Sequence, residues 1–258
     1  MKRYLFLGIC LSLTACGGGG GGDIVPNYSA IKQFGDGSGI ARGAASKGDQ
    51  KAVMYMFTPD VLEVVASANA TGSDPGPDFD PQDFPLVSQL AGYDFRQGNL
   101  EGANVTIVSK PINDSGVDNV VLYFEYQGEK MIMSMSDGLV GMPEGQMTYG
   151  GLYSVEDSRY PDWFEIGDVT LIANFENRSF SIDAVSETTR LSGDGFLDVG
   201  SGQISSVDLL LNDFGMNTSS NSSILGGVGG NNASGVTGIW YSNESTPIYK
   251  GAIIGNKQ

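Results

Sequence analysis

Alternation of apolar and polar residues dominates the second half of the chain. In residues 169–175 and again in 180–184, every second residue is apolar and those between are mostly polar. A period of two with one apolar face is typical of antiparallel strands whose other face meets water. Short runs at residues 195–199, 203–211, 235–241 and 248–255 continue the series, with Gly and Ser turns between them.

An earlier pair of runs, residues 119–126 and 130–135, flanks Gln127-Gly128-Glu129 and predicts a hairpin. Six or more consecutive antiparallel strands without an intervening helix predict a barrel or a sandwich. Closure into a barrel is favoured because it removes open edges that would pair between molecules. Residues 217–232 are rich in Ser, Asn and Gly and have little to bury, so we expect a long loop there between two late strands.

The first half of the chain has a different pattern. Residues 23–50 are small and polar, which indicates a linker or an irregular first strand. Thr58-Pro59-Asp60 supplies a cap, a proline and an acid, and valines follow at helical spacing, which predicts a helix of about three turns. One or two further helical turns are expected in residues 85–91. Residues 51–116 are therefore predicted to form a small N-terminal region of helix and loop.

The first sixteen residues have the order of an export signal. Lys2 and Arg3 make a positive start, and residues 4–13 form an apolar run that is too short to span a bilayer. Leu13-Thr14-Ala15-Cys16 follows and resembles the lipobox of bacterial lipoproteins. That resemblance implies a signal peptide, residues 1–16, that ends at a lipidated Cys16. The alternative is a plain secretory peptide with a fortuitous cysteine.

Six consecutive glycines, residues 17–22, come directly after the lipobox. They have no side chains to bury and high backbone entropy, so residues 17–50 are predicted to be a Gly-rich tether and linker. A phosphate-binding loop is excluded, because such a loop lies between a strand and a helix. Gly17 stands where an aspartate would act as a retention signal. By resemblance to lipoprotein sorting in Gram-negative bacteria, this favours the outer membrane.

Composition narrows the function further. The 258 residues include no histidine, which excludes Ser-His-Asp and Cys-His catalysis in their usual form and imidazole metal ligands. A formal net charge of -16 argues against nucleic acid and against a polybasic membrane contact. The export segment takes two of the 14 basic residues, so 12 remain against 30 acidic ones. It also holds Cys10, which leaves no disulfide in the mature chain. We expect no cofactor and a monomer.

The tail carries a resemblance to a known family. Gly235-Val236-Thr237-Gly238-Ile239-Trp240-Tyr241, followed by Gly251-Ala252-Ile253-Ile254-Gly255, resembles the closing hairpin of transferrin-binding-protein-like β-barrel surface lipoproteins. Residues 168–182 and 193–211 are similar to the strand pairs that precede it. The resemblance covers residues 117–258 and implies an eight-stranded antiparallel β-barrel on a lipid anchor. It does not imply transferrin as the ligand.

Two segments suggest binding chemistry. Tyr160, Trp163 and Phe164 lie in a short aromatic stretch between two strands, where rigid rings could anchor a partner or, alternatively, close the end of the barrel by burial. Ser192-Gly193-Asp194-Gly195 with Asp198 offers oxygen ligands for a hard cation, but it lacks the EF-hand order, so a turn is the simpler interpretation. No metal site is predicted.

Three functions are compatible with these features. The first is a non-enzymatic lipoprotein of the outer membrane, displayed at the cell surface, whose barrel loops bind a protein or nutrient partner such as a metal carrier. The second is a lipocalin-like barrel with a small apolar ligand in its lumen, which a lumen filled by side chains would contradict. The third is an envelope hydrolase that uses two carboxylates, and it needs convergent acids in a cleft.

Overall fold

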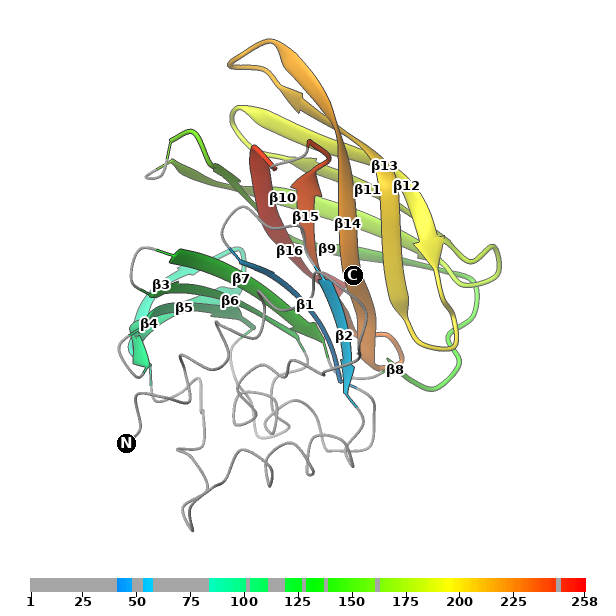
Figure 1. Ribbon diagram of the computed structural model, residues 1–258. Coiled ribbons are helices and arrows are strands. Elements are labelled where there is room, and N and C mark those ends of the chain that lie inside the picture. Colours follow the sequence, from blue (N-terminus) through cyan, green and yellow to red (C-terminus); the bar gives the residue numbers. More distant parts are fainter. Residues whose placement is uncertain are drawn as a thin grey trace, which may run out of the picture.

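The computed structural model describes residues 41–47, 53–57, 84–100, 103–110, 119–126, 129–136, 139–160, 163–244 and 247–258. These residues form sixteen strands in two sheets and contain no helix (Figure 1). In the part of the chain that is described, no helix is long and apolar enough to cross a membrane. The lipobox, the glycine tether and the predicted helix after Thr58 all lie outside the described residues.

The first sheet is open and has seven antiparallel strands in the order β2-β1-β7-β6-β5-β4-β3. Its strands are β1 (Ala41–Lys47), β2 (Val53–Phe57), β3 (Leu86–Leu90), β4 (Tyr93–Leu100), β5 (Ala103–Ser109), β6 (Asn119–Tyr126) and β7 (Glu129–Ser136). Most neighbours in this sheet are also neighbours in sequence. The exception is the pair of β1 and β7, which are neighbours in the sheet but are far apart in sequence.

The second sheet closes on itself. Each strand from β9 to β16 pairs antiparallel with the next, and β16 pairs with β9 to complete the ring. The strands are β9 (Gln146–Asp157), β10 (Phe164–Asn174), β11 (Ser179–Val185), β12 (Thr189–Leu197), β13 (Gln203–Asp213), β14 (Thr218–Asn231), β15 (Gly235–Ser242) and β16 (Tyr249–Lys257). Two-residue β8 (Leu139–Val140) adds to β14 in parallel. The predicted eight-stranded antiparallel barrel is confirmed.

The barrel occupies less of the chain than the predicted range 117–258. It begins at Gln146, and the hairpin of β6 and β7 belongs to the open sheet instead. β2 to β5 also place strands in residues 51–116, where helix and loop were expected, and β1 lies within residues 23–50, where a linker or an irregular first strand was expected. A period of two identifies a strand but not its partner. The pairing of β6 with β5 and of β7 with β1 assigns the hairpin to the open sheet.

Residues 86–90 form strand β3 rather than the helical turns predicted for residues 85–91. Ala91 and Gly92, with φ values of 50° and 82°, make a two-residue turn that returns the chain antiparallel as β4. Positive φ at both positions is the geometry of the tight hairpin turn that matches strand twist. The prediction was wrong because the turn at the end of this segment decides its conformation.

Residues 218–231 form strand β14, so the long loop predicted there is wrong. The strand pairs along its length with β13 on one side and β15 on the other. Its glycines permit a close approach to β15: a Cβ atom on Gly226 would lie 2.1 Å from the carbonyl oxygen of Thr237. A small-residue strand at this position therefore satisfies the closed ladder, although its composition resembles that of a loop.

Side chains fill the interior of the barrel. Trp240, Tyr149, Tyr153 and Phe180 are among the largest fully buried residues, and Trp240 stacks on Tyr153 with ring centroids 5.5 Å apart. The indole Nε1–H of Trp240 donates to the carbonyl oxygen of Ser154 at 3.0 Å. Leu, Ile and Val side chains from all eight strands complete the same cluster. The lumen is a packed core.

A second apolar cluster joins the two sheets. Tyr93, Val108 and Val121 of the open sheet pack on Leu152, Ile239 and Ile254 of the barrel wall. The hydroxyl of Tyr123 donates to Ser154 Oγ at 2.7 Å beside this cluster. A pocket at this junction has about 20 Å³, which is room for a single water molecule. The open sheet thus covers one side of the barrel, made by β9, β16 and β15.

Candidate partner-binding site

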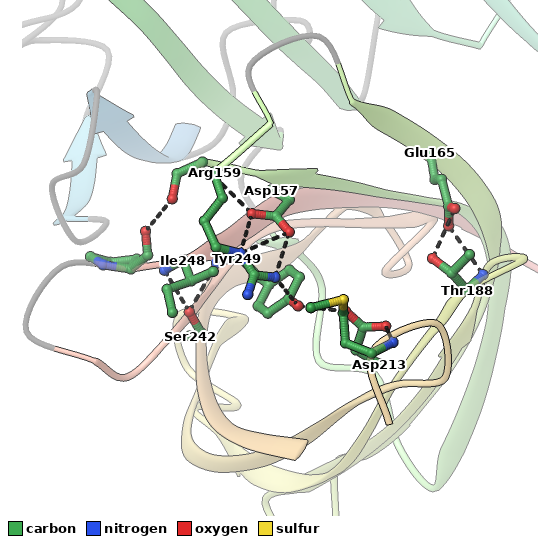
Figure 2. Close-up of polar contacts among 11 residues, drawn as sticks. Asp157, Arg159, Glu165, Thr188, Asp213, Ser242, Ile248 and Tyr249 are labelled. Atoms are coloured by element: carbon green, nitrogen blue, oxygen red, sulfur yellow. Dashed lines mark hydrogen bonds and ion pairs between the residues drawn. The ribbon is translucent and has the colours of Figure 1, made fainter. Parts of the chain in front are cut away.

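One end of the barrel gathers the connections β9–β10, β11–β12, β13–β14 and β15–β16, because antiparallel strands alternate in direction. We call this end the mouth and define it by the described residues 157–160, 163–165, 186–189, 213–218, 242–244 and 247–249. Figure 2 shows the polar contacts that organise it. They involve side chains from all four of these connections, which are far apart in sequence.

Arg159 forms the centre of a hydrogen-bonded chain across the mouth. Its Nε and Nη2 atoms donate to Asp157 Oδ1 at 2.9 Å and Oδ2 at 2.6 Å, a bidentate ion pair whose carboxylate is almost fully buried. Nη2 also donates to the hydroxyl of Tyr249 at 2.5 Å, and that hydroxyl donates to Asp213 Oδ2 at 2.5 Å (Figure 2). This series of hydrogen bonds links the end of β9 to the start of β16 and the end of β13.

These contacts shift the titration of two groups. Burial, followed by the hydrogen bond to Asp213, raises the pKa of Tyr249 to about 12. The hydrogen bond to Asp157 raises the pKa of Arg159 further above its ordinary value. Both shifts move the titration of these two groups further above the physiological range, where the phenol is neutral and the guanidinium is charged.

Arg159 also supports an exposed ring. Its guanidinium lies 5.1 Å from the ring centroid of Tyr249 and 5.9 Å from that of Tyr160, within the range of cation–π attraction. The Tyr160 N–H donates to the Asp157 carbonyl, and the Trp163 N–H donates to the Tyr160 carbonyl at 2.8 Å. Tyr160 is 55% exposed and is thus held in place before any partner arrives.

The neighbouring β13–β14 turn adds two more exposed apolar side chains, Phe214 and Met216. Asp213 Oδ1 accepts from the Met216 N–H at 2.8 Å, while its other oxygen accepts from Tyr249 (Figure 2). The Phe214 N–H donates to the Thr188 carbonyl at 2.7 Å. The turn is therefore fixed to both adjacent connections, and its apolar side chains project from a rigid base.

Two further caps complete the mouth. Glu165 accepts a hydrogen bond from Thr188 Oγ1 at 2.8 Å (Figure 2). It also accepts one from Ser186 Oγ at 2.6 Å, and the two together fix the β11–β12 turn. Ser242 Oγ accepts from the N–H groups of Ile248 and Tyr249, each at 3.0 Å. Each contact satisfies polar groups that a strand end would otherwise leave unpaired.

The three aromatic residues predicted as partner contacts have different surroundings. Tyr160 is exposed at the mouth, but Trp163 is half-buried and packs against the barrel core. Phe164 opens β10 and meets Tyr123 of the open sheet edge-on, with ring centroids 5.7 Å apart. The structure therefore does not gather them on one surface. It instead places Tyr160 at the same end of the barrel as Phe214 and Met216.

The sequence interpretation missed Arg159, Phe214 and Met216. Phe214-Gly215-Met216-Asn217 has the sequence of a turn with two large apolar residues, which is an unusual composition for a solvated turn. That signal was hidden because the following segment was interpreted as a loop. Arg159 gave no signal, because its role depends on Tyr249, which is distant in the sequence, as well as on the nearby Asp157.

Little in the site favours metal or acid–base chemistry. Within the described residues, no group of three His, Cys, Asp or Glu side chains is placed to hold a metal ion. Ser192-Gly193-Asp194-Gly195 lies inside β12, so the turn expected there is wrong, and only Asp198 lies in the turn that follows. Strand pairing extends the four residues along the barrel wall.

Comparisons with solved structures identify the fold. The structure is similar to isotype 1 transferrin binding protein B from serogroup B Neisseria meningitidis, with a TM-score of 0.55, 8% sequence identity, and coverage of 85% of this chain and 43% of that one. It is similar to intact Ap-TbpB, with N and C lobes, at a TM-score of 0.50 and 12% identity, covering 93% of this chain and 48% of that one. No family model matches the chain, and no curated protein matches its sequence.

At these identities the likeness concerns the fold alone. The chain has a fold like that of transferrin binding protein B, and it spans less than half the length of the two solved chains. The predicted resemblance is thereby confirmed at the level of architecture.

Proposed function

We propose that this chain is a non-enzymatic lipoprotein of the Gram-negative outer membrane, anchored through Cys16 and displayed at the cell surface, whose barrel mouth binds a protein partner. The observation that carries the proposal is the support given to Tyr160: an exposed aromatic ring held by a guanidinium that is itself fixed by Asp157 and Tyr249. Preorganised aromatic anchors on a rigid scaffold are typical of binding hot spots.

The fold supports this proposal. The first of the two similar solved structures is named as transferrin binding protein B, and a metal-carrier protein is therefore the first class of partner to test here. The partner surface should be neutral or basic, because the chain has a formal net charge of -16.

The anchor is tested by replacing the lipid-accepting residue. Cys16→Ala should release the protein from membranes into the soluble fraction, because a chain without acyl groups has no comparable membrane affinity. Protease treatment of intact cells should remove the wild-type domain. Continued membrane association of the variant would contradict the anchor, and full protection from protease would contradict surface display.

The mouth is tested by a pair of double variants. Tyr160→Ser with Phe214→Ser should weaken binding of the partner at least about tenfold, as loss of a hot spot does. Val87→Ser with Leu90→Ser, on exposed positions of β3, is the matched control and should bind as wild type. Transferrin, iron-loaded and iron-free, is the first probe, followed by affinity capture with the full chain. Equal capture by both double variants would contradict a partner site at the mouth.

The observations disfavour the two alternative functions. The filled lumen has no room for a small apolar ligand, and the pocket at the junction has room for only about one water molecule. The carboxylates that converge at the mouth, Asp157 and Asp213, are engaged by Arg159 and Tyr249. A hydrolase would need one of them free beside a bound substrate.

A further inference from the structure

The wall of the barrel opposite the open sheet has a distinctive surface. The sheet packs on β9, β15 and β16, so β12 and β13 lie on the far side of the ring, away from it (Figure 1). On these two strands the outward side chains Phe196, Val207 and Leu210 are exposed by 54%, 66% and 42%. Asp194 and Asp208 are exposed among them. We call these five residues the wall patch.

The backbone at the wall patch departs from a regular ladder. The pairing of β12 with β13 shifts register between Ser192 and Phe196, and that of β13 with β14 shifts between Ser206 and Leu209. Such bulges commonly redirect side chains near functional surfaces. Here the two shifts share the segment 206–209, and Val207 lies at its centre as the most exposed member of the wall patch.

Hydrogen bonds fix the bulge in one conformation. Ser206 Oγ donates to the Asp194 carbonyl at 2.7 Å, and Asn243 Nδ2 donates to the Val207 carbonyl at 2.8 Å. The amide oxygen of Asn243 accepts in turn from Ser223 Oγ at 2.6 Å. Polar side chains thus hold the backbone of Val207 while its apolar side chain faces solvent.

The strands on either side of the wall patch present polar residues outward. Ser179, Ser181 and Asp183 do so on β11, which exposes one apolar residue, Val185, at its end. Ser219 and Asn221 do so on β14. Exposed apolar side chains that gather on two paired strands beside mostly polar strands mark interaction sites on soluble proteins. Scattered single apolar residues would need no such explanation.

Charge selects the class of partner. None of the ion pairs formed by the described residues includes Asp194 or Asp208, so the wall patch combines apolar side chains with two unneutralised acids. A second copy of this chain, at a net charge of -16, would bring like charges together, and anionic lipid would do the same. We infer that the wall patch is a second docking surface, separate from the mouth, for a protein segment in which Lys or Arg flanks an apolar residue.

The test uses a random peptide library displayed on phage and selected on the full chain. The expected result is enrichment of peptides with Lys or Arg beside Leu, Val or an aromatic residue. Phe196→Ser with Val207→Ser should weaken the binding of these peptides at least about tenfold. Asp194→Asn with Asp208→Asn should weaken their binding and reduce its dependence on salt concentration. Because the replaced side chains are exposed, the circular dichroism spectrum should not change.

Controls separate the wall patch from other surfaces. Val87→Ser with Leu90→Ser removes equally exposed side chains from β3 and should leave selection unchanged. Tyr160→Ser with Phe214→Ser removes two exposed apolar side chains of the mouth and should also leave peptide selection unchanged. Failure of this inference is therefore distinct from failure of the proposed function. The inference is overturned if no peptides are enriched, if the enriched peptides are acidic, or if they bind the wall-patch variant as well as wild type. It is also overturned if the full, unlipidated chain sediments with anionic vesicles and the wall-patch variant does not.

Discussion

The closed barrel and the open sheet are built from the same kind of strand but differ in what holds them. Every barrel strand has two partners, and the buried side chains of all eight strands meet in one core. The open sheet has edge strands β2 and β3, and its pairing of β1 with β7 is non-local. Its β4 to β7 bury apolar residues against the outside of the barrel. The barrel is thus the scaffold, and the sheet depends on it.

This difference has a consequence for function. The mouth and the wall patch both lie on the barrel, where closure fixes the strand ends and the bulge. Rigid elements hold binding residues more precisely than open edges do. The exposed apolar residues of β3 lie on an edge strand of the open sheet, which is why we assign them no binding role.

The largest expected effect comes from the barrel core. Trp240→Ala removes a fully buried ring, its stack on Tyr153 and its hydrogen bond to Ser154, and should lower the free energy of unfolding by about 3–5 kcal/mol. Urea unfolding of the full chain measures this. Val207→Ala, on the exposed wall, is the control and should change it by less than about 0.5 kcal/mol. Similar losses in both variants would show that the lumen is not the main core.

A smaller effect is expected at the mouth. Tyr249→Phe leaves Asp213 Oδ2 without its donor and removes one hydrogen-bond acceptor of Arg159. It should lower the free energy of unfolding by about 1–3 kcal/mol. Tyr160 should also become more mobile, and partner affinity should fall. Unchanged affinity in this variant would mean that preorganisation by Arg159 does not matter.

The same variant has a pH signature. Burial and the Asp213 hydrogen bond raise the pKa of Tyr249 from 10.0 to about 12, so the native state binds more protons than the unfolded state between these values. The stability that this shift supplies is fully present below pH 10 and is lost as the pH rises towards 12. Tyr249→Phe should therefore show a shallower fall in stability from pH 10 to 12 than wild type. Unfolding measured at several pH values tests this, and identical slopes would contradict it.

The junction between the two sheets should show a more local effect. Tyr123→Phe removes the hydroxyl that donates to Ser154 Oγ and should cost about 1 kcal/mol. Because Ser154 Oγ keeps its hydrogen bond from the Ala252 N–H, the barrel itself should be little affected. Amide hydrogen exchange should speed up in β4 to β6 and not in β10 to β13. Equal acceleration in both would show that the two sheets open as one unit.

The smallest effect is expected on the outer barrel wall. Arg190 pairs with Asp183 at 2.7 Å, but both side chains are half-exposed. Exposed pairs of this kind contribute little, because water and salt screen them. Arg190→Ala should leave the melting temperature unchanged within error, and a clear decrease would mean that the wall depends on charge.

Strands with a clear alternation of apolar and polar residues could be predicted, and β3 and β14 could not. Alternation at residues 169–175 and 180–184 identified β10 and β11, because both strands bury one face and meet at a short turn. The small-residue strand β14 was missed, since glycine carries no periodic signal and its role lies in close approach to β15. The helical turns expected at residues 85–91 failed because the Ala91-Gly92 turn decided the local structure.

The candidate site was predicted only in part. Tyr160 was identified from its loop, and it alone of the three aromatic residues is exposed at the mouth without meeting the open sheet. Asp157, Asp213 and Tyr249 come from three strand ends, and no spacing along the sequence brings them together. A hydrogen-bonded network of this kind is a property of barrel closure.

The central claim is that the mouth faces the outside of the cell, where a partner can reach Tyr160. Both natural cysteines lie in the first sixteen residues, so Tyr160→Cys would supply the only unmodified thiol of the lipidated chain. Labelling intact cells with a membrane-impermeant maleimide measures its exposure directly. We expect the thiol at position 160 to be labelled in intact cells. Labelling that occurs only after the outer membrane is permeabilised would contradict it.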